Sequence, residues 1–322
     1  MKAIVISAPG GPEVLEYTTV DDPTPGPGQA VVEIAAAGLN YIDTYHRIAL
    51  YPMNFPMTPG LEGSGTIVEL ADDVTGFSVG DRVAWTGALG SYADAVAADA
   101  SVLVPVPDGI EMETAAAIPL QGMTAHYLVR DTYALKPESR CLIHAGAGGV
   151  GLLVIQMAKL IGAEVFTTVS SAEKAQLASA AGADHVIRYD EVNFADAIEE
   201  IAGPRPLDVV YDGVGKTTFD DGLRLLRPRG LMALFGAASG PVPPLDLQVL
   251  AQNGSLFATR PTLFSYIAKR EELLSRANDI FGWINSGDLQ VRIGQTWPLE
   301  QAADAHRALH ARATTGKTLL IP

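Results

Sequence analysis

The stretch His144-Ala-Gly-Ala-Gly-Gly-Val-Gly151 is the strongest local signal in this 322-residue chain. Its glycines at 146, 148 and 151 form the pattern G-x-G-x-x-G, which is weak alone because 32 glycines produce chance matches. Here an apolar run typical of a buried strand, Cys141–His144, precedes the pattern, and an apolar helical run, Gly149–Leu160, follows it. A strand, a glycine turn and a helix in this order predict a dinucleotide site.

Each glycine of the pattern has its own physical reason. Gly146 permits the tight turn, and Gly148 lets backbone N–H groups approach a pyrophosphate. Gly151 lets the helix pack closely on the strand, with the helix N-terminus facing the anion. The alternative, a glycine-rich turn in a fold that binds no nucleotide, is the weaker interpretation because the flanking strand and helix are both present.

The residues after the next predicted strand, Glu164–Val169, bear on the choice of cofactor. An NAD site places Asp or Glu there to hold the ribose 2′-hydroxyl. This chain has Ser170 and Ser171 instead, and no carboxylate until Glu173, which Lys174 follows. Small hydroxyls and a cation suit a 2′-phosphate. Taken alone, Lys174 could equally be a solvated surface lysine. Together, the missing acid and the lysine favour NADPH over NADH.

Residues 121 to about 260 alternate between strand-like and helical patterns. The strand-like runs are Cys141–His144, Glu164–Val169, His185–Arg188, Leu207–Tyr211, Leu231–Phe235 and Leu256–Ala258. The helical patterns are Gly149–Leu160, Ala172–Ala181, Phe194–Ala202 and Phe219–Leu226. Ser170 and Glu173 have the spacing of a capping box for the second helix. The alternation predicts a parallel sheet with helices on both faces, which is a doubly wound α/β domain.

The two ends of the chain predict a second domain of a different kind. Short β-type runs, punctuated by Gly and Pro, predict a barrel-like or sandwich-like domain; they are Ala3–Ile6, Ala30–Ala35, Gly65–Leu70, Asp81–Trp85 and Tyr92–Val96. The last sixty residues contain helical patterns at Tyr266–Ser286 and Leu299–Arg312 and an apolar end, Thr318–Ile321. We expect this segment to return to the first domain. The predicted domains are therefore 1–120 with 261–322, and 121–260 inserted between them.

Composition and charge narrow the class of protein. A net charge of −15 opposes binding to nucleic acid or anionic membranes, which both attract Lys and Arg. The N-terminus lacks the pattern of a signal peptide, and no stretch approaches the roughly 20 apolar residues of a membrane span. The single cysteine, Cys141, excludes an internal disulfide, and we interpret it as a small buried hydrophobic residue. A cytoplasmic protein fits these observations.

Motifs of other enzyme classes are absent. Neither Gly-Lys-Thr triplet has the upstream glycine of a P-loop, and the Tyr-x-x-x-Lys pair of short-chain reductases does not occur. His306 and His310 are four residues apart on a predicted helix, a spacing that can bind zinc. Arg307, however, stands where a metalloprotease needs glutamate. We interpret both histidines as surface residues.

With these motifs in place, the whole chain resembles the medium-chain dehydrogenase/reductases, specifically their quinone oxidoreductase (zeta-crystallin-like) branch. Besides the glycine stretch, the resemblance rests on the blocks Ala36–Asp43, Leu50–Pro52, Pro59–Gly65, Val79–Val83, Gln121–Leu128, Asp212–Gly215, Arg229–Gly230 and Gly316–Pro322. It implies a GroES-like β-rich catalytic domain, a Rossmann domain inserted before the C-terminal segment, and a cleft between the two.

The resemblance also bears on metal binding. Zinc-dependent members bind the catalytic metal through a Cys, a Gly-His-Glu motif and a second Cys. In this chain Asn40 stands at the first position and Leu61 at that of the histidine, and the four-cysteine structural lobe is missing. Because a zinc site needs three or four N, S or O ligands, we expect no metal.

The family implies where substrate and cofactor bind. By resemblance, Asn40, Asp43 and Tyr51 line the nicotinamide end of the cleft, with Asn40 and Tyr51 as the candidate catalytic hydrogen-bond donors to an acceptor oxygen. Asn40 could equally be a turn residue, and Tyr51 a packing aromatic. The other implied cofactor contacts are Thr124, Gly146, Gly148, Gly149, Val150, Ser170, Ser171, Lys174, Tyr189, Val214, Phe235, Gly236, Ala237 and Lys317. A homodimer, paired through an edge strand at Ser255–Thr259, is also implied.

The absence of zinc ligands limits the chemistry. An unactivated ketone needs a Lewis acid, whereas a quinone or enone is already a strong hydride acceptor whose product water can protonate. We therefore expect an NADPH:quinone oxidoreductase that positions nicotinamide against its acceptor. Two alternatives stay open: an NADPH-dependent double-bond reductase of enones or alkenals, and an NADPH-binding sensor or structural protein with little turnover.

Overall fold

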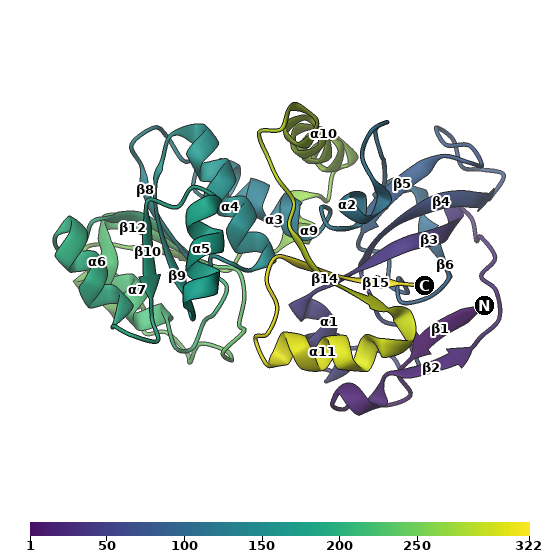
Figure 1. The fold of residues 1–322 in the computed structure, drawn as a ribbon, viewed down its shortest axis with the longest axis horizontal. Helices are drawn as coiled ribbons and strands as arrows, with labels where there is room; N and C mark the ends of the chain where they lie inside the picture. The colour runs from purple at the N-terminus through teal and green to yellow at the C-terminus, as the bar shows by residue number, and fades with distance from the viewer. The chain divides into compact units, whose positions relative to one another are not determined.

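The computed structural model describes residues 1–322, which form two compact units (Figure 1). Unit 1 contains Met1–Met123, Ile267–Gly287 and Val291–Pro322, whereas unit 2 contains Thr124–Tyr266 and Asp288–Gln290. Unit 2 is therefore inserted into the chain of unit 1. The joins lie a few residues from the boundaries 120/121 and 260/261 that the sequence suggests.

Unit 1 is built on a seven-stranded sheet and a two-stranded sheet. The order in the large sheet is β14-β15-β3-β4-β5-β7, with β6 paired to β3, and β1 pairs with β2 in the small one. The strands are β1 (Lys2–Val5), β2 (Glu16–Thr19), β3 (Gln29–Leu39), β4 (Glu62–Leu70), β5 (Arg82–Thr86), β6 (Ala95–Asp99), β7 (Leu103–Pro105), β14 (Ile293–Pro298) and β15 (Lys317–Ile321). Strand β3 is central in this sheet and mostly buried, and β4, β6 and β15 all pair with it. The C-terminal strand thus completes the sheet that the N-terminal residues begin.

The helices of unit 1 are short apart from one. They are α1 (Tyr41–Arg47), α2 (Met112–Ala116), α10 (Arg270–Ser286) and α11 (Ala302–His310), with single turns η1 (Pro12–Val14), η2 (Ala100–Val102) and η4 (Leu299–Gln301). Helix α3 (Gln121–Tyr127) runs across the join with unit 2. Helix α1 has a capping box, in which the Asn40 N–H donates to the Asp43 carboxylate. This cap starts the helix directly after β3.

Three predicted elements of unit 1 are misplaced. The helix predicted at Tyr266–Ser286 begins only at Arg270, because Lys269 has extended backbone and ends the continuity with α9 (Leu263–Tyr266). The helix predicted at Leu299–Arg312 starts as the turn η4 and ends at His310. The strand predicted at Tyr92–Val96 lies three residues later, as β6. The residues beyond the observed ends are of mixed burial, since Tyr92 and Leu299 are buried whereas Lys269 and Arg312 are exposed. The apolar pattern therefore does not mark where the backbone hydrogen bonds begin and end.

Unit 2 is a parallel six-stranded sheet in the order β10-β9-β8-β11-β12-β13. The strands are β8 (Arg140–His144), β9 (Glu164–Val169), β10 (His185–Arg188), β11 (Leu207–Asp212), β12 (Leu226–Leu234) and β13 (Phe257–Thr259). The helices are α4 (Gly149–Ile161), α5 (Ala172–Ala180), α6 (Phe194–Ala202), α7 (Phe219–Leu225), α8 (Leu247–Gln252) and α9, with a π turn, η3 (Leu128–Thr132). The chain order reverses between β8 and β11, where doubly wound sheets bind ligands. The predicted fold class is confirmed.

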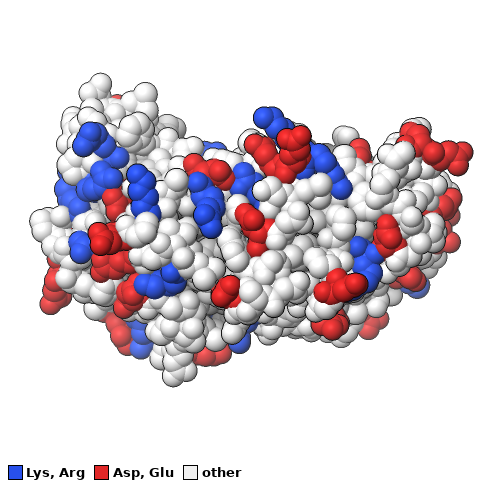
Figure 2. Space-filling model, turned by 90° about the horizontal axis from the view of Figure 1, so that it is seen from above, with Lys and Arg blue, Asp and Glu red and all other residues white.

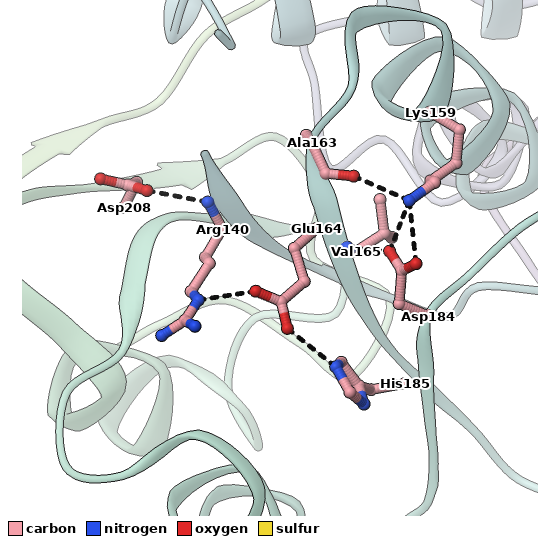
Figure 3. A network of polar contacts seen from close by, with 8 residues as sticks. All are labelled: Arg140, Lys159, Ala163, Glu164, Val165, Asp184, His185 and Asp208. Atoms are coloured by element: carbon pink, nitrogen blue, oxygen red, sulfur yellow. Dashed lines mark hydrogen bonds and ion pairs between the residues drawn. The ribbon is translucent and has the colours of Figure 1, made fainter. Parts of the chain in front are cut away.

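Charged side chains gather at the opposite, amino edge of this sheet (Figure 3). Glu164 at the start of β9 accepts hydrogen bonds from Arg140 (2.6 Å) and His185 (2.9 Å). Asp184 accepts from Lys159 (2.8 Å) and from the Val165 N–H (2.8 Å). These contacts lie where the strands begin, and we call the charged side chains among them the amino-edge network, which consists of Arg140, Lys159, Glu164, Asp184, His185 and Asp208. It ties the starts of neighbouring strands together.

Two further observations concern the surface. None of the helices combines the length and the apolar composition that crossing a bilayer requires. On the face drawn in Figure 2, Lys and Arg side chains lie among Asp and Glu side chains. That face therefore offers no continuous basic strip of the kind that follows a nucleic-acid backbone.

Candidate active site

The glycine stretch forms the turn between β8 and α4, at the carboxyl end of the sheet. A Cβ on Gly146 would lie 2.0 Å from the Thr167 hydroxyl oxygen, and one on Gly151 would lie 2.4 Å from the Ala145 carbonyl oxygen. These two glycines are therefore required by the protein's own packing. A Cβ on Gly148, the N-cap, would meet only the Ala145 carbonyl oxygen, at 3.2 Å. Its missing side chain instead leaves room beside the N–H groups that begin the 13-residue helix α4, a favourable place for a phosphate.

The residues predicted to hold the adenosine phosphate meet at the ends of β9 and β10. Ser171 caps α5 by accepting a hydrogen bond from the Lys174 N–H at 3.3 Å. The Lys174 ammonium donates to the Ser170 hydroxyl at 3.4 Å. Tyr189 follows β10, and its N–H bonds to the Val169 carbonyl at 3.1 Å. The donors suit a 2′-phosphate, so the residues fit the group that the sequence predicts.

One detail of this cap differs from the prediction. The N-cap of α5 is Ser171 and not Ser170, so the third helical residue is Lys174 and Glu173 lies one position too early for a capping box. The reciprocal bond from a glutamate is therefore not formed. The cap depends on the serine hydroxyl alone.

The loops after β11 and β12 are held by Asp212, which the sequence analysis did not single out. Its Oδ1 accepts the N–H of Val214 (2.7 Å) and of Gly215 (2.9 Å), and its carbonyl accepts the Phe235 N–H (2.8 Å). The predicted cofactor contacts at 214 and 235–237 thus lie on two loops that Asp212 holds together. Since β8, β11 and β12 are neighbours, these loops lie at the same sheet edge as the glycine turn. Thr124, another predicted cofactor contact, lies in α3 and is buried.

In unit 1, Asn40 and Lys317 belong to a buried cluster. The Lys317 ammonium forms an ion pair with Glu62, and both side chains are almost fully buried. The Asn40 Oδ1 accepts from Lys317 (3.0 Å) and Gln121 (3.0 Å), while its Nδ2 donates to Glu62 (2.7 Å) and the Gly38 carbonyl (3.2 Å). The Asn40 carboxamide therefore has all four of its hydrogen bonds within unit 1.

Asp43 extends this cluster toward α11. Its Oδ2 accepts the Asn40 N–H (2.8 Å) and the Tyr92 hydroxyl (3.0 Å), and its buried Oδ1 has no hydrogen-bond partner. Burial raises the pKa of Asp43 from 3.8 to about 7, although hydrogen bonds from Asn40 and Tyr92 oppose the increase. Asp43 therefore changes its charge near neutral pH. We call the residues Asn40, Asp43, Arg47, Glu62, Tyr92, Gln121, His306 and Lys317 the buried network.

The interpretation of His306 as a surface residue is wrong. His306 is fully buried, and its ring is hydrogen-bonded to Arg47 (2.8 Å) and Tyr92 (3.2 Å). Burial and the nearby guanidinium lower its pKa from 6.5 to about 3. His310, four residues later, is exposed. Helical spacing alone did not distinguish the two, because α11 turns one face to the core and the other to solvent.

Tyr51 lies outside the buried network. Its side chain is 39% exposed, and its ring meets Tyr45 and His46 edge to face at centroid distances of 6.0 and 6.1 Å. Its hydroxyl makes no hydrogen bond within the protein. Of the two predicted donors, only Tyr51 thus has a donor that the fold leaves unused.

The residues that the sequence analysis missed are Glu62, Tyr92, Gln121, His306 and Asp212. Glu62 and Gln121 are in blocks that carry the family resemblance, but neither belongs to a chemical motif. Their role depends on partners distant in sequence, such as the ion pair between residues 62 and 317. The structure places no three His, Cys, Asp or Glu side chains where they could hold a metal ion. Cys141 is buried, which raises the pKa of its thiol to about 12.

Comparisons with known proteins agree with this arrangement. Residues 26–108 match the family model of the alcohol dehydrogenase GroES-like domain, and residues 149–276 match that of the zinc-binding dehydrogenases. A quinone oxidoreductase of Pseudomonas aeruginosa is 47% identical over all of this chain and 99% of its own length. A 2-haloacrylate reductase of a Burkholderia species is 38% identical, over 99% of this chain and 98% of its own.

A solved structure extends the comparison to three dimensions. Escherichia coli quinone oxidoreductase, complexed with NADPH, superposes with a TM-score of 0.98 at 42% identity, over 100% of both chains. The two family models, the full-length relatives and the superposed fold therefore indicate the same family. The chain belongs to the medium-chain dehydrogenase/reductase superfamily, in its quinone oxidoreductase branch.

Proposed function

We propose that the protein is an NADPH-dependent oxidoreductase that transfers hydride to a quinone or a similar conjugated carbonyl compound. The observation that carries the proposal is the end of β9, where two serines and Lys174 meet and the acid of an NAD site is missing. The full-length relatives include quinone oxidoreductases, one of them complexed with NADPH. Bound NADPH supplies the hydride.

Unit 2 would hold most of the cofactor. The N–H groups at the start of α4 would bind the pyrophosphate, and the Lys174 ammonium with the two serines would bind the 2′-phosphate. The proposed contacts in unit 2 are Thr124, Gly146, Gly148, Gly149, Val150, Ser170, Ser171, Lys174, Tyr189, Val214, Phe235, Gly236 and Ala237. Lys174 should distinguish NADPH from NADH most directly, because it is the only cationic side chain among these unit 2 contacts.

Unit 1 would supply the contacts to the nicotinamide and the acceptor, through Asn40, Asp43, Tyr51 and Lys317. Asn40 and Tyr51 are the proposed hydrogen-bond donors to the acceptor oxygen. Because both Asn40 donors are already used by Glu62 and Gly38, Tyr51 is the donor to test first. We expect Tyr51→Phe to lower kcat for a quinone about 10-fold or more, with NADPH affinity unchanged.

A reaction without zinc fits the residues at the family's metal positions. Asn40 replaces the first cysteine, and its oxygen is bound by an ammonium and an amide, which leaves no lone pair for a metal. Leu61 replaces the histidine and has no donor atom at all. A quinone does not need a Lewis acid, so the proposed metal-free site and the proposed substrate support each other.

A second candidate activity is reduction of a conjugated double bond. The relative named as a 2-haloacrylate reductase favours it, because an acrylate also accepts hydride at a carbon activated by a carbonyl group. Both activities need the same cofactor and the same orientation of the hydride. They differ in which acceptors are turned over.

The proposal extends to assembly and location. Strand β13 is the last strand of the unit 2 sheet, so one of its edges is unpaired, and Phe257 on it is 60% exposed. An unpaired, apolar edge suits pairing with a second copy of the chain, so we propose a homodimer. A cytoplasmic location suits an enzyme that draws on the cellular NADPH pool. Its only other partner would be the small-molecule acceptor.

The experiment that tests the proposed function follows NADPH absorbance with a panel of quinones, enones and 2-haloacrylates. We expect turnover of quinones with NADPH, at least 10-fold weaker activity with NADH, and no effect of a chelator. Lys174→Ala should raise KM for NADPH but not for NADH. Binding of NADPH without turnover of any acceptor would contradict the proposal and favour a sensor.

A further inference from the structure

Two opposite charges are buried in unit 1 without an ion-pair partner. The Arg47 guanidinium in α1 is almost fully buried, and its hydrogen bonds go to His306 and to the Gly10 carbonyl, not to a carboxylate. The Asp43 carboxylate in the same helix is fully buried and bonds only to Asn40 and Tyr92. A buried charge is costly unless it is compensated. Each of the two therefore needs a source of compensation.

Hydrogen bonds connect the two groups in one direction. Arg47 can only donate, so the His306 Nδ1 at 2.8 Å must accept and carries no proton. The proton of the neutral ring is then on Nε2, which donates to the Tyr92 oxygen at 3.2 Å. The Tyr92 hydroxyl in turn donates to Asp43 at 3.0 Å. Every donor in the chain thus points from the guanidinium toward the carboxylate.

We propose that His306 and Tyr92 join Arg47 to Asp43 as one ion pair mediated by two neutral groups, and that Arg47, His306 and Tyr92 are positioning residues for Asn40. Asp43 is the point of contact, because the same oxygen that accepts from Tyr92 also accepts the Asn40 N–H. The anionic form of Asp43 binds this N–H most strongly. The link to catalysis rests on the proposed function, whereas the mediated ion pair does not.

The other charged groups near these hydrogen bonds form no ion pair with Arg47 or Asp43. On the Asp43 side, Lys317 in β15 lowers the pKa of Asp43 and Glu62 in β4 raises it, and these two are paired with each other. On the His306 side, Arg47 and His310 both oppose a positive charge on the ring. Glu13, from η1, interacts electrostatically with Arg47 but forms no ion pair with it. The hydrogen bonds through His306 and Tyr92 are therefore the direct connection between Arg47 and Asp43.

The first test titrates Asp43 directly. The NMR signal of its carboxyl carbon, assigned with Asp43→Asn, should titrate near pH 7 in the wild type. In Tyr92→Phe the titration should move up by about one pH unit, because a hydrogen bond to the anion is lost. His306→Phe keeps a ring beside Tyr92 and should move it in the same direction. Tyr211→Phe, which removes a hydroxyl from an equally buried tyrosine in unit 2, is the control and should leave it unchanged.

The second test is a double-mutant cycle between side chains that do not touch. Asp43→Asn and Arg47→Met should be non-additive in urea unfolding, because each single variant leaves the other charge uncompensated. The double variant should unfold at a higher urea concentration than the two single shifts predict. The excess should disappear when the cycle is repeated with Tyr92→Phe. Additive shifts in both backgrounds would overturn the mediated ion pair.

The third test connects the chain of hydrogen bonds to turnover. We expect kcat/KM for a quinone to rise with pH through the Asp43 titration, which gives the pH profile an inflection. This inflection should move up by about one pH unit in Tyr92→Phe and should be absent in Asp43→Asn. An unchanged inflection in both variants overturns the positioning role. If no acceptor is turned over but the NMR titration shifts as described, the proposed function has failed while the mediated ion pair stands.

Discussion

Polar side chains gather at two places in this protein, and the two places differ in how far they are removed from water. In the buried network, Glu62 and Lys317 are almost fully buried. In the amino-edge network of Figure 3, the paired side chains of Arg140, Glu164, Lys159 and Asp184 remain about one-third exposed. Both networks contain a carboxylate paired with an ammonium group, Glu62 with Lys317 in one and Asp184 with Lys159 in the other. What differs is the cost of leaving a charge without its partner.

This difference has a functional meaning. A charge that water can reach is compensated by solvent when its partner is removed, so exposed pairs contribute little to stability. A buried charge has no such substitute, so every member of the buried network depends on the others. A buried ion pair is weak evidence of a contribution to stability. The buried network contains Asn40, Asp43 and Lys317, which are proposed to contact the cofactor, whereas the amino-edge network lies at the sheet edge opposite the glycine turn.

The largest effect should come from breaking the Glu62–Lys317 pair on one side only. Glu62→Gln leaves the Lys317 ammonium buried without a counter-charge, and we expect it to lower the free energy of unfolding by about 3–5 kcal/mol. The double variant Glu62→Gln, Lys317→Met removes both charges and should recover much of this loss. Urea unfolding of the two variants measures the difference. Equal destabilisation of both would show that shape, and not charge, holds this cluster together.

The second effect appears in the pH dependence of stability. Burial raises the pKa of Asp43 from 3.8 to about 7, so the folded protein binds a proton that the unfolded chain lacks, and stability falls as pH rises over this range. His306 acts oppositely, since burial lowers its pKa from 6.5 to about 3 and stability is lost as pH falls over that range. The two contributions largely cancel in the wild type.

Asp43→Asn should therefore unmask the contribution of His306. The urea midpoint of this variant should rise with pH between about 3 and 6.5 more steeply than that of the wild type. Asp304→Asn, which changes an exposed aspartate of α11, is the matched control and should follow the wild-type curve. Identical slopes for the wild type and Asp43→Asn would mean that Asp43 titrates alike in the folded and unfolded states.

The sequence predicts the strands that carry the amino-edge network, but it predicts the contacts of neither network. The strands β8, β9 and β10 were predicted almost to the residue, because alternating patterns report local structure, and their order placed the glycine turn correctly after β8. The buried network depends instead on contacts across more than 250 residues, such as those of Lys317 with Asn40 and of His306 with Arg47. No local pattern encodes such a contact. His306 was therefore mistaken for a surface residue, and Glu62 had no signal beyond its place in a family block.

A third and smaller effect on the free energy of unfolding is expected at Asp184 in the amino-edge network. Asp184 accepts both from Lys159 and from the Val165 N–H in β9. Asp184→Asn keeps one acceptor oxygen and loses the charge, so we expect a loss of about 1–2 kcal/mol. Chemical denaturation measures it, and NADPH affinity should not change. A loss as large as that of Glu62→Gln would erase the distinction between the two networks.

The smallest effect belongs to Glu164. Burial raises the pKa of this carboxyl, but hydrogen bonds from His185 and Arg140 outweigh it, so the pKa is lowered overall. The pair therefore stabilises the fold above the ordinary pKa of glutamate and is lost as pH falls. Because its side chains are partly exposed, Glu164→Gln should cost less than about 1 kcal/mol at neutral pH, and salt should reduce even that difference. Unfolding of wild type and variant at low and high salt tests this directly, since a difference that persists in high salt would place Glu164 with the buried pairs.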